Sequence, residues 1–212
     1  MITTEGLLEA YYDCRKRKRK TASAIMYEIN YESKLIELRN RVNNRTYQPG
    51  KSICFIVTRP RYREVFAAAF EDRIIHHWIA IRLEPLFEQI FSPRTFNCRK
   101  EKGQLYGVNM LVNDIKTCSR NYTRDCYILQ LDLKGYFMSI NKQILYGLLC
   151  DSLGRMRHRK AENGKRWDDM VDFEFVDYLI REILMRNPTD HVTKVGRKRD
   201  WENVPPSKSL FC

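Results

Sequence analysis

An apolar run of six residues, 126–131, lies between two aspartates, Asp125 and Asp132. A run of this length, rich in aliphatic side chains, is typical of a strand buried within a sheet. A carboxylate cannot stay ionised in a dry core, so Asp132 must lie at the rim of that sheet, in an ion pair or beside a bound cation. The sequence therefore predicts a buried strand over residues 126–131 that ends in an accessible carboxylate.

The residues that follow Asp132 indicate what this carboxylate could bind. Gly135 allows a sharp turn, which would leave the Asp132 side chain and the Leu133 carbonyl facing one cleft. Hard oxygen atoms of this kind suit Mg²⁺, which takes few protein ligands and completes its shell with water and phosphate oxygens. The alternative is structural, because Asp132 could also cap the strand end or pair with Lys134 or an arginine.

The upstream half carries the signals of a hairpin and of several helices. Residues 52–58 and 62–70 are rich in aliphatic and aromatic side chains, and Arg59-Pro60-Arg61 between them is a turn sequence. Apolar residues at helical spacing predict helices over residues 3–45 with a break near Asn30, 71–91 with a kink or end at Pro85, 105–118, 141–153 and 168–186. These elements predict an α+β fold.

The chain is strongly basic, with 38 Lys and Arg against 26 Asp and Glu and a formal net charge of +12. The cations gather in residues 15–20, 154–166 and 194–199. An excess of this size is typical of proteins that bind nucleic acid, although solubility alone would also explain it. The six consecutive cations at 15–20 equally fit a solvated helix end or a localisation-like tract, and we assign them no function.

Cysteine spacing and hydropathy limit the class of protein. The seven cysteines never form a Cys-x-x-Cys pair, so neither a disulfide framework nor a zinc ribbon is expected. No stretch of 18 apolar residues occurs, and the N-terminus lacks a charged start followed by an apolar core. We therefore expect free thiols, no membrane partner and a cytoplasmic location.

Four blocks of residues follow one another in a fixed order. They are Arg-Glu-Val-Phe-Ala-Ala with His-His-Trp inside residues 63–78, Leu-Glu-Pro-Leu-Phe at 83–87, Phe-Asn-Cys-Arg-Lys-Glu-Lys-Gly at 96–103 and Leu-Asp-Leu-Lys-Gly-Tyr-Phe at 131–137. This series resembles a bacterial reverse transcriptase of the group II intron and retron type, and most closely the enzymes of diversity-generating retroelements. The resemblance is good over residues 50–140 and loose in the flanks.

The resemblance implies a fold and a set of partners. It implies the fingers of a polymerase right hand, with helices around a short antiparallel hairpin, followed by an incomplete palm. The corresponding domains are an N-terminal helical extension at 1–48, fingers at 49–125 and a partial palm with basic insertion loops at 126–212. The implied partners are an RNA template, a DNA primer or cDNA strand, deoxynucleoside triphosphates and a basic accessory protein of the retroelement.

The resemblance also implies roles for residues that follow the apolar run at 126–131. Asp132 matches the first catalytic aspartate that holds two Mg²⁺ ions, with the Leu133 carbonyl as a further ligand. Phe137 matches the aromatic residue that fills the space of a ribose 2′-hydroxyl, which favours DNA over RNA synthesis. From the residues alone, Phe137 could instead belong to the core.

Four cations match positions on the fingers. Arg63 matches the arginine that grips the incoming triphosphate, because a guanidinium offers bidentate donors to phosphate oxygens. Arg59 or Arg61 would supply a second cation at the hairpin tip. Arg99 and Lys100 would lie along the template strand. An outward-facing charge on a strand is the structural alternative for Arg63.

Two further groups of residues are interpreted as structural. Asp72 and Arg73 are expected to form an ion pair or the start of a helix, and His76 and His77 to pack or face solvent without binding metal.

The sequence also departs from the family pattern. Met138 stands where the family usually has an acidic residue, and neither Tyr-x-Asp-Asp nor Leu-Pro-x-Gly occurs in the chain. With a single carboxylate for the metals, the chain is expected to be the N-terminal part of a polymerase and inactive by itself. The alternative is a non-catalytic RNA-binding module derived from the fingers.

Overall fold

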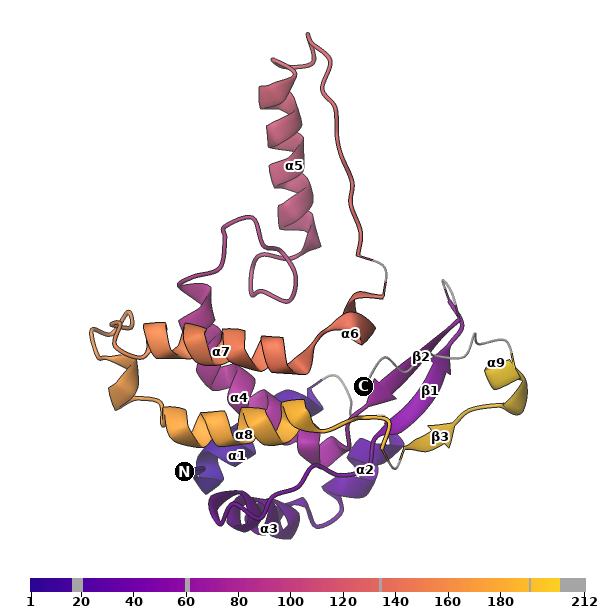
Figure 1. Ribbon diagram of the computed structural model, residues 1–212, viewed down its shortest axis with the longest axis vertical. Coiled ribbons are helices and arrows are strands. Elements are labelled where there is room, and N and C mark those ends of the chain that lie inside the picture. Colours follow the sequence, from indigo (N-terminus) through magenta and orange to yellow (C-terminus); the bar gives the residue numbers. More distant parts are fainter. Residues whose placement is uncertain (17–20, 60–61, 134, 191, 203–212) are drawn as a thin grey trace. The chain divides into compact units, whose positions relative to one another are not determined.

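The computed structural model describes residues 1–16, 21–59, 62–133, 135–190 and 192–202 (Figure 1). Helices predominate, and the described strands form one small three-stranded sheet, so the predicted α+β class is confirmed. The chain divides into two compact units, residues 1–86 with 137–212 and residues 87–136. The expected domain boundaries at 48 and 125 follow family subdomains rather than compactness and stay a prediction.

The N-terminal part of the first unit is helical, as predicted. It contains α1 (Thr4–Arg15), α2 (Ala22–Glu28) and α3 (Tyr31–Asn43). The Thr3 side chain caps α1 by accepting a hydrogen bond from the Gly6 amide at 3.1 Å. Asn30 separates α2 from α3 because its backbone is left-handed, with φ of 58°, which confirms the predicted break.

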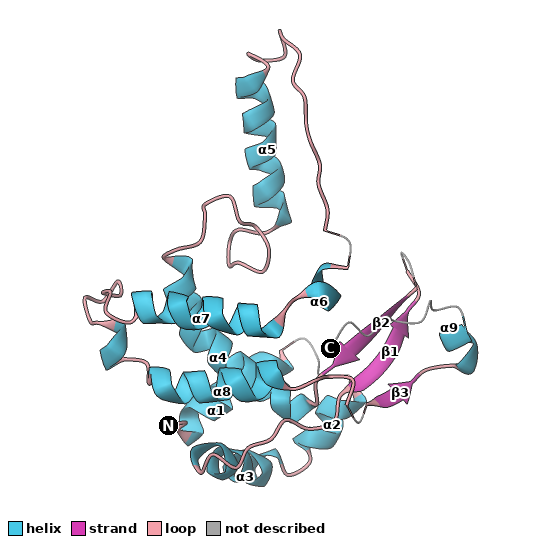
Figure 2. Ribbon diagram, viewed as in Figure 1, coloured by secondary structure: helices cyan, strands magenta, loops and turns pink. Residues whose placement is uncertain are grey.

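The predicted hairpin is confirmed by β1 (Ile53–Val57) and β2 (Arg63–Ala67), which pair antiparallel with Val57 opposite Arg63. A third strand, β3 (Thr193–Val195), pairs parallel with β1 on its other edge (Figure 2). The sequence did not predict β3. Its three residues are too few to produce a detectable alternation, and it is held by pairing with a segment about 140 positions earlier.

The core of the first unit lies between α4 (Phe70–Glu88), α8 (Phe173–Met185) and the N-terminal helices. Trp78 of α4 meets Phe175 of α8 edge to face, with ring centroids 5.9 Å apart. Pro85 does not end the helix, since α4 continues to Glu88, and the alternative of a kink at Pro85 stays a prediction. The buried apolar residues of the two helices are Phe70, Ile74, Ile75, Trp78, Leu83, Leu86, Phe173, Phe175, Val176, Leu179 and Ile180.

Side-chain caps determine where the two long helices of the C-terminal half begin. Asn141 accepts a hydrogen bond from the Ile144 amide at 3.0 Å and begins α7 (Lys142–Met156), as predicted. Helix α8 was expected from residue 168 but begins at Phe173, because Asp172 caps it and Trp167–Asp169 form a separate 3₁₀ turn. The described part of the chain also contains two short helices, α6 (Tyr136–Ser139) and α9 (Lys198–Glu202).

The second unit consists of an irregular connection, α5 (Gln104–Cys118) and an extended segment. Helix α5 agrees with the prediction for residues 105–118. The predicted buried strand at 126–131 is wrong, because these residues have no regular secondary structure and Tyr127 and Leu131 are 91% and 82% exposed. A strand requires a partner for its backbone hydrogen bonds, and the described residues of this unit contain no strand.

None of the described helices is long and apolar enough to cross a membrane.

Candidate functional site

Asp132 lies in the extended segment of the second unit, next to a turn. Its side chain is exposed, and among the described residues it has no ion-pair partner. The predicted turn is confirmed, since Gly135 has φ of 68° and the Tyr136 amide donates to the Leu133 carbonyl at 3.3 Å. That carbonyl therefore already accepts one hydrogen bond within the turn.

The fit of Mg²⁺ to these residues can be judged from the available carboxylates. No three His, Cys, Asp or Glu side chains come together in the described part of the chain in a way that could hold a metal ion. Two Mg²⁺ ions need several oxygen ligands between them, and Asp132 with one partly used carbonyl cannot supply these. The described residues by themselves do not fit a two-metal site.

Phe137 belongs to the first unit and lies on α6. Its side chain is 78% exposed, so the interpretation of Phe137 as a core residue is wrong. An exposed ring on a short helix is available to contact a ligand, which is the property that a steric selector of the sugar needs. Met138 beside it lies in the same helix.

Arg63 is the first residue of β2 and its side chain is exposed. It stands opposite Val57, where β1 ends and the hairpin turns. The position agrees both with an outward-facing charge and with a phosphate contact. Arg61 lies outside the described residues, whereas Arg59 is described and exposed at the same end of the hairpin.

Arg99 lies inside the second unit rather than on its surface. Its side chain is only 3% exposed and forms a bidentate ion pair with Glu88, with Nε and Nη2 at 2.7 and 2.6 Å from the carboxylate oxygens. Nη1 also donates to the carbonyls of Ser92 and Thr95. Four of its five N–H groups thus donate hydrogen bonds, so Arg99 organises the connection after α4. Of the two cations predicted to contact the template, Arg99 and Lys100, only Lys100 is exposed.

This ion pair leads to a pH-dependent prediction. The hydrogen bonds from Arg99 hold the pKa of the Glu88 carboxyl below its ordinary value. The pair therefore stabilises the connection fully above the unfolded pKa of about 4.3, and this contribution is lost as pH falls through the lower folded value. Hydrogen exchange should show residues 92–100 opening more readily in Glu88→Gln than in wild type at pH 7, with the difference vanishing at low pH.

Glu101→Gln is the matched control, because Glu101 is an exposed glutamate of the same connection without an ion pair among the described residues. A Glu88→Gln protein that exchanges like wild type at pH 7 would contradict the structural role of the pair.

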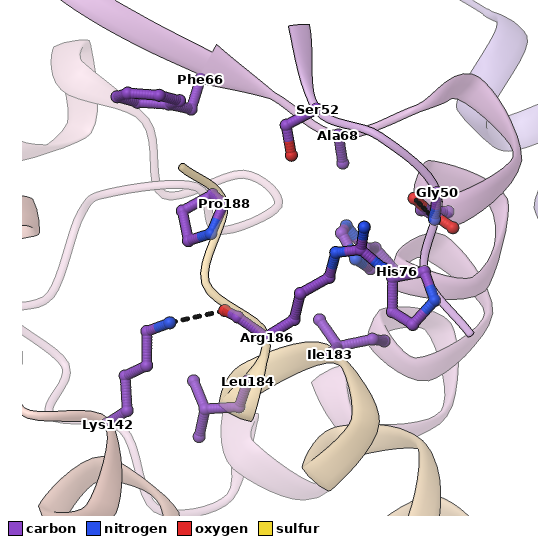
Figure 3. A pocket seen from close by; sticks show the side chains of 12 residues that line it. Gly50, Ser52, Phe66, Ala68, His76, Lys142, Ile183, Leu184, Arg186 and Pro188 are labelled. Atoms are coloured by element: carbon purple, nitrogen blue, oxygen red, sulfur yellow. Dashed lines mark hydrogen bonds between the residues drawn. The ribbon is translucent and has the colours of Figure 1, made fainter. Parts of the chain in front are cut away.

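One hollow of the first unit is a cavity of about 280 Å³ (Figure 3). His76, Lys142 and Arg186 contribute basic side chains to a wall that is otherwise largely apolar. The Lys142 ammonium donates to the Arg186 carbonyl at 2.5 Å, and burial lowers the pKa of Lys142. The other lining residues are Pro49, Gly50, Ser52, Phe66, Ala68, Asp72, Ile183, Leu184 and Pro188.

Asp72, the one carboxylate among the described residues that line this cavity, already has hydrogen-bond partners. Its two oxygens accept hydrogen bonds from the Tyr47 hydroxyl at 2.7 Å and the Gly50 amide at 2.8 Å. Of the two structural roles expected for Asp72 and Arg73, the ion pair is wrong, since Arg73 donates to the Ser23 hydroxyl instead, whereas the helix start is confirmed because both residues lie at the beginning of α4. Asp72 ties the segment before β1 to α4, which is a structural role.

His77 likewise has a structural partner. Its Nδ1 lies 2.7 Å from an Asp13 carboxylate oxygen, which joins α4 to α1.

A second hollow, at the end of the sheet, was not recognised from the sequence. It has a volume of about 320 Å³ and is lined by Thr58, Arg59, Tyr62, Arg197, Arg199 and Asp200. We call these six residues the tip cluster. The basic stretch at 194–199 was visible in the sequence, but its proximity to the hairpin depends on β3 pairing with β1.

Comparison of the chain with models of protein families gives no match, and comparison with curated proteins gives no significant match.

Proposed function

We propose that this chain is the N-terminal fingers and first palm motif of an RNA-directed DNA polymerase, which copies an RNA template into cDNA by two-metal nucleotidyl transfer. The observation that carries the proposal is the ordered series of four sequence blocks between residues 63 and 137. The hairpin of β1 and β2, directly followed by α4, agrees with the fingers that this series implies. The exposure of Phe137 and the turn at Gly135 also support it.

The roles of individual residues follow from their chemistry. Arg63 would bind a phosphate of the incoming nucleotide through its guanidinium, and Phe137 would exclude a ribose 2′-hydroxyl by its volume. Mg²⁺ supplies the activation of the primer hydroxyl and the stabilisation of the departing pyrophosphate in this class of reaction. Because the described residues do not fit both ions, the proposed reaction needs carboxylates in addition to Asp132, and we assign no catalytic step to this chain alone.

The proposed binding of nucleic acid can be tested directly with the 212-residue chain, because its positive net charge predicts a salt-dependent affinity. We expect it to bind an RNA strand or an RNA–DNA hybrid, with an affinity that falls by about 300-fold or more between 50 and 200 mM salt if six or more phosphates are contacted. Fluorescence anisotropy with a labelled strand measures this. The same chain should extend no primer, since it has one of the required carboxylates.

The two possible functions differ in what the full-length polypeptide does. Primer extension on RNA by the polypeptide that contains this chain would support the polymerase. If both the 212-residue chain and any longer polypeptide that contains it bind RNA but extend no primer, the non-catalytic RNA-binding module is favoured. An affinity that is unchanged by salt would contradict both.

A further inference from the structure

The parallel pairing of β3 with β1 determines where the chain goes next. In the register, Thr193 lies beside Ile53 and Val195 beside Phe55, so both strands run toward the turn of the hairpin. Residues after Val195 therefore emerge at the same end of the sheet as Thr58 and Arg59 (Figure 1). An antiparallel β3 would have sent the same cations to the opposite end.

Local contacts hold the following segment at this end. Gly196 has φ of 129°, a conformation that strains other residues, and it turns the chain from β3 into α9. The Lys194 ammonium lies over the Trp201 ring, 4.9 Å from its centroid, which ties α9 back to β3. Arg197 and Arg199 are thus placed beside the hairpin by the fold and by two specific contacts.

The six residues of the tip cluster carry more positive than negative charge. Arg59, Arg197 and Arg199 provide three guanidinium groups, and Asp200 is the one carboxylate among these six residues. Asp200 lies 3.2 Å from Nε of Arg197 and 4.0 Å from Nε of Arg199, so it holds the two arginines next to each other. Their side chains are nevertheless 68% and 70% exposed, whereas Asp200 is 17% exposed.

The hollow also has an aromatic wall. Tyr62 is 43% exposed and lies on the hairpin between the basic turn and β2. Basic side chains beside an accessible ring are the combination that binds a single nucleic-acid strand, because phosphates pair with the cations and a base stacks on the ring. A guanidinium suits phosphate better than an ammonium would, since it donates two parallel hydrogen bonds.

We propose that the tip cluster binds the backbone of a single RNA strand, with Arg59, Arg197 and Arg199 on its phosphates and Tyr62 against a base. The inference rests on the proposed nucleic-acid function of the chain but not on polymerisation. It assigns a role to the end of the basic stretch at 194–199, which the family resemblance leaves without one.

The test is binding of a labelled single-stranded RNA of about 16 nucleotides, the upper range for compact single-strand sites. The variant is Arg197→Gln with Arg199→Gln in the 212-residue chain, and the readout is fluorescence anisotropy over a salt series. Two lost phosphate contacts should weaken binding about tenfold or more and reduce the slope of log affinity against log salt by roughly 1.4. Tyr62→Ala should weaken binding about tenfold with the slope unchanged.

The matched control is Arg120→Gln with Arg124→Gln, which removes the same charge from two exposed arginines of the second unit. The RNA affinity of this control should equal that of wild type, apart from the small decrease that any loss of two positive charges causes. Circular dichroism on all variants shows that each remains folded.

The possible failures are distinguishable. If wild type binds RNA and the Arg197 and Arg199 variant binds equally well, the tip-cluster site is wrong while the proposed function survives. If wild type binds no RNA, both are wrong. A competition experiment with inorganic triphosphate distinguishes an RNA site from a nucleotide site. If triphosphate displaces RNA from wild type where sodium chloride of the same ionic strength does not, and if it displaces no RNA from the variant, the cluster binds a nucleotide and the inference is wrong.

Discussion

If the chain belongs to a polymerase as proposed, replacing Asp132 with alanine is expected to reduce nucleotide incorporation by the longer polypeptide by roughly 10³-fold or more, the scale seen when a group at the reacting centre is removed. The carboxylate is exposed and makes no ion pair among the described residues, so its loss should leave the fold and the affinity for template nearly unchanged. Primer extension with an RNA template and deoxynucleotides measures the rate, and anisotropy measures the binding.

Asp125→Ala is the matched control for this substitution. Asp125 is another exposed aspartate of the same extended segment, seven positions earlier, and the proposed site assigns it no role. We expect it to extend primers like wild type. Asp132→Ala enzyme with the wild-type rate would remove Asp132 from the active site and with it the main chemical argument for a polymerase.

Replacing Phe137 with alanine is expected to admit ribonucleotides. The ring is 78% exposed on α6, so its removal leaves no cavity in the core of the described structure and should not unfold the protein. Selection by steric exclusion of a small group is typically worth about 10- to 200-fold. The preference for deoxynucleotides over ribonucleotides, measured as a ratio of kcat/KM values in the proposed full-length enzyme, should fall by that factor.

Tyr122→Ala serves as the control for Phe137, because Tyr122 is an exposed aromatic residue of the loop after α5 and is 62% exposed. Its nucleotide preference should match wild type. A Phe137→Ala enzyme that still rejects ribonucleotides would show that another residue selects the sugar.

Local sequence predicted the elements that are stabilised mainly by local interactions. The helix start at Asn141, the break at Asn30 and the turn at Gly135 each depend on one residue and its near neighbours, and the structure contains all three. The hairpin was predictable for the same reason, since its two strands are joined by a short basic turn. These interactions are nearly independent of the rest of the chain.

Other features depend on partners that are distant in sequence. The polar sequence around Arg99 does not indicate that Glu88 and two carbonyls surround this side chain. The sequence at the start of α4 likewise does not indicate that Asp72 accepts hydrogen bonds from Tyr47 and Gly50. Each of these groups had several potential partners. Packing selected one of them.

The sequence by itself determined the order of helices, the hairpin, the basic character of the chain and the resemblance that suggests a polymerase, because these are written in periodicity, turn residues, charge and motif order. The tertiary structure decided two opposite outcomes. Among the described residues it left the apolar run at 126–131 without a strand partner, since β-propensity alone forms no hydrogen bonds. It also paired the three residues of β3 with β1, which brought Arg197 and Arg199 to the hairpin tip.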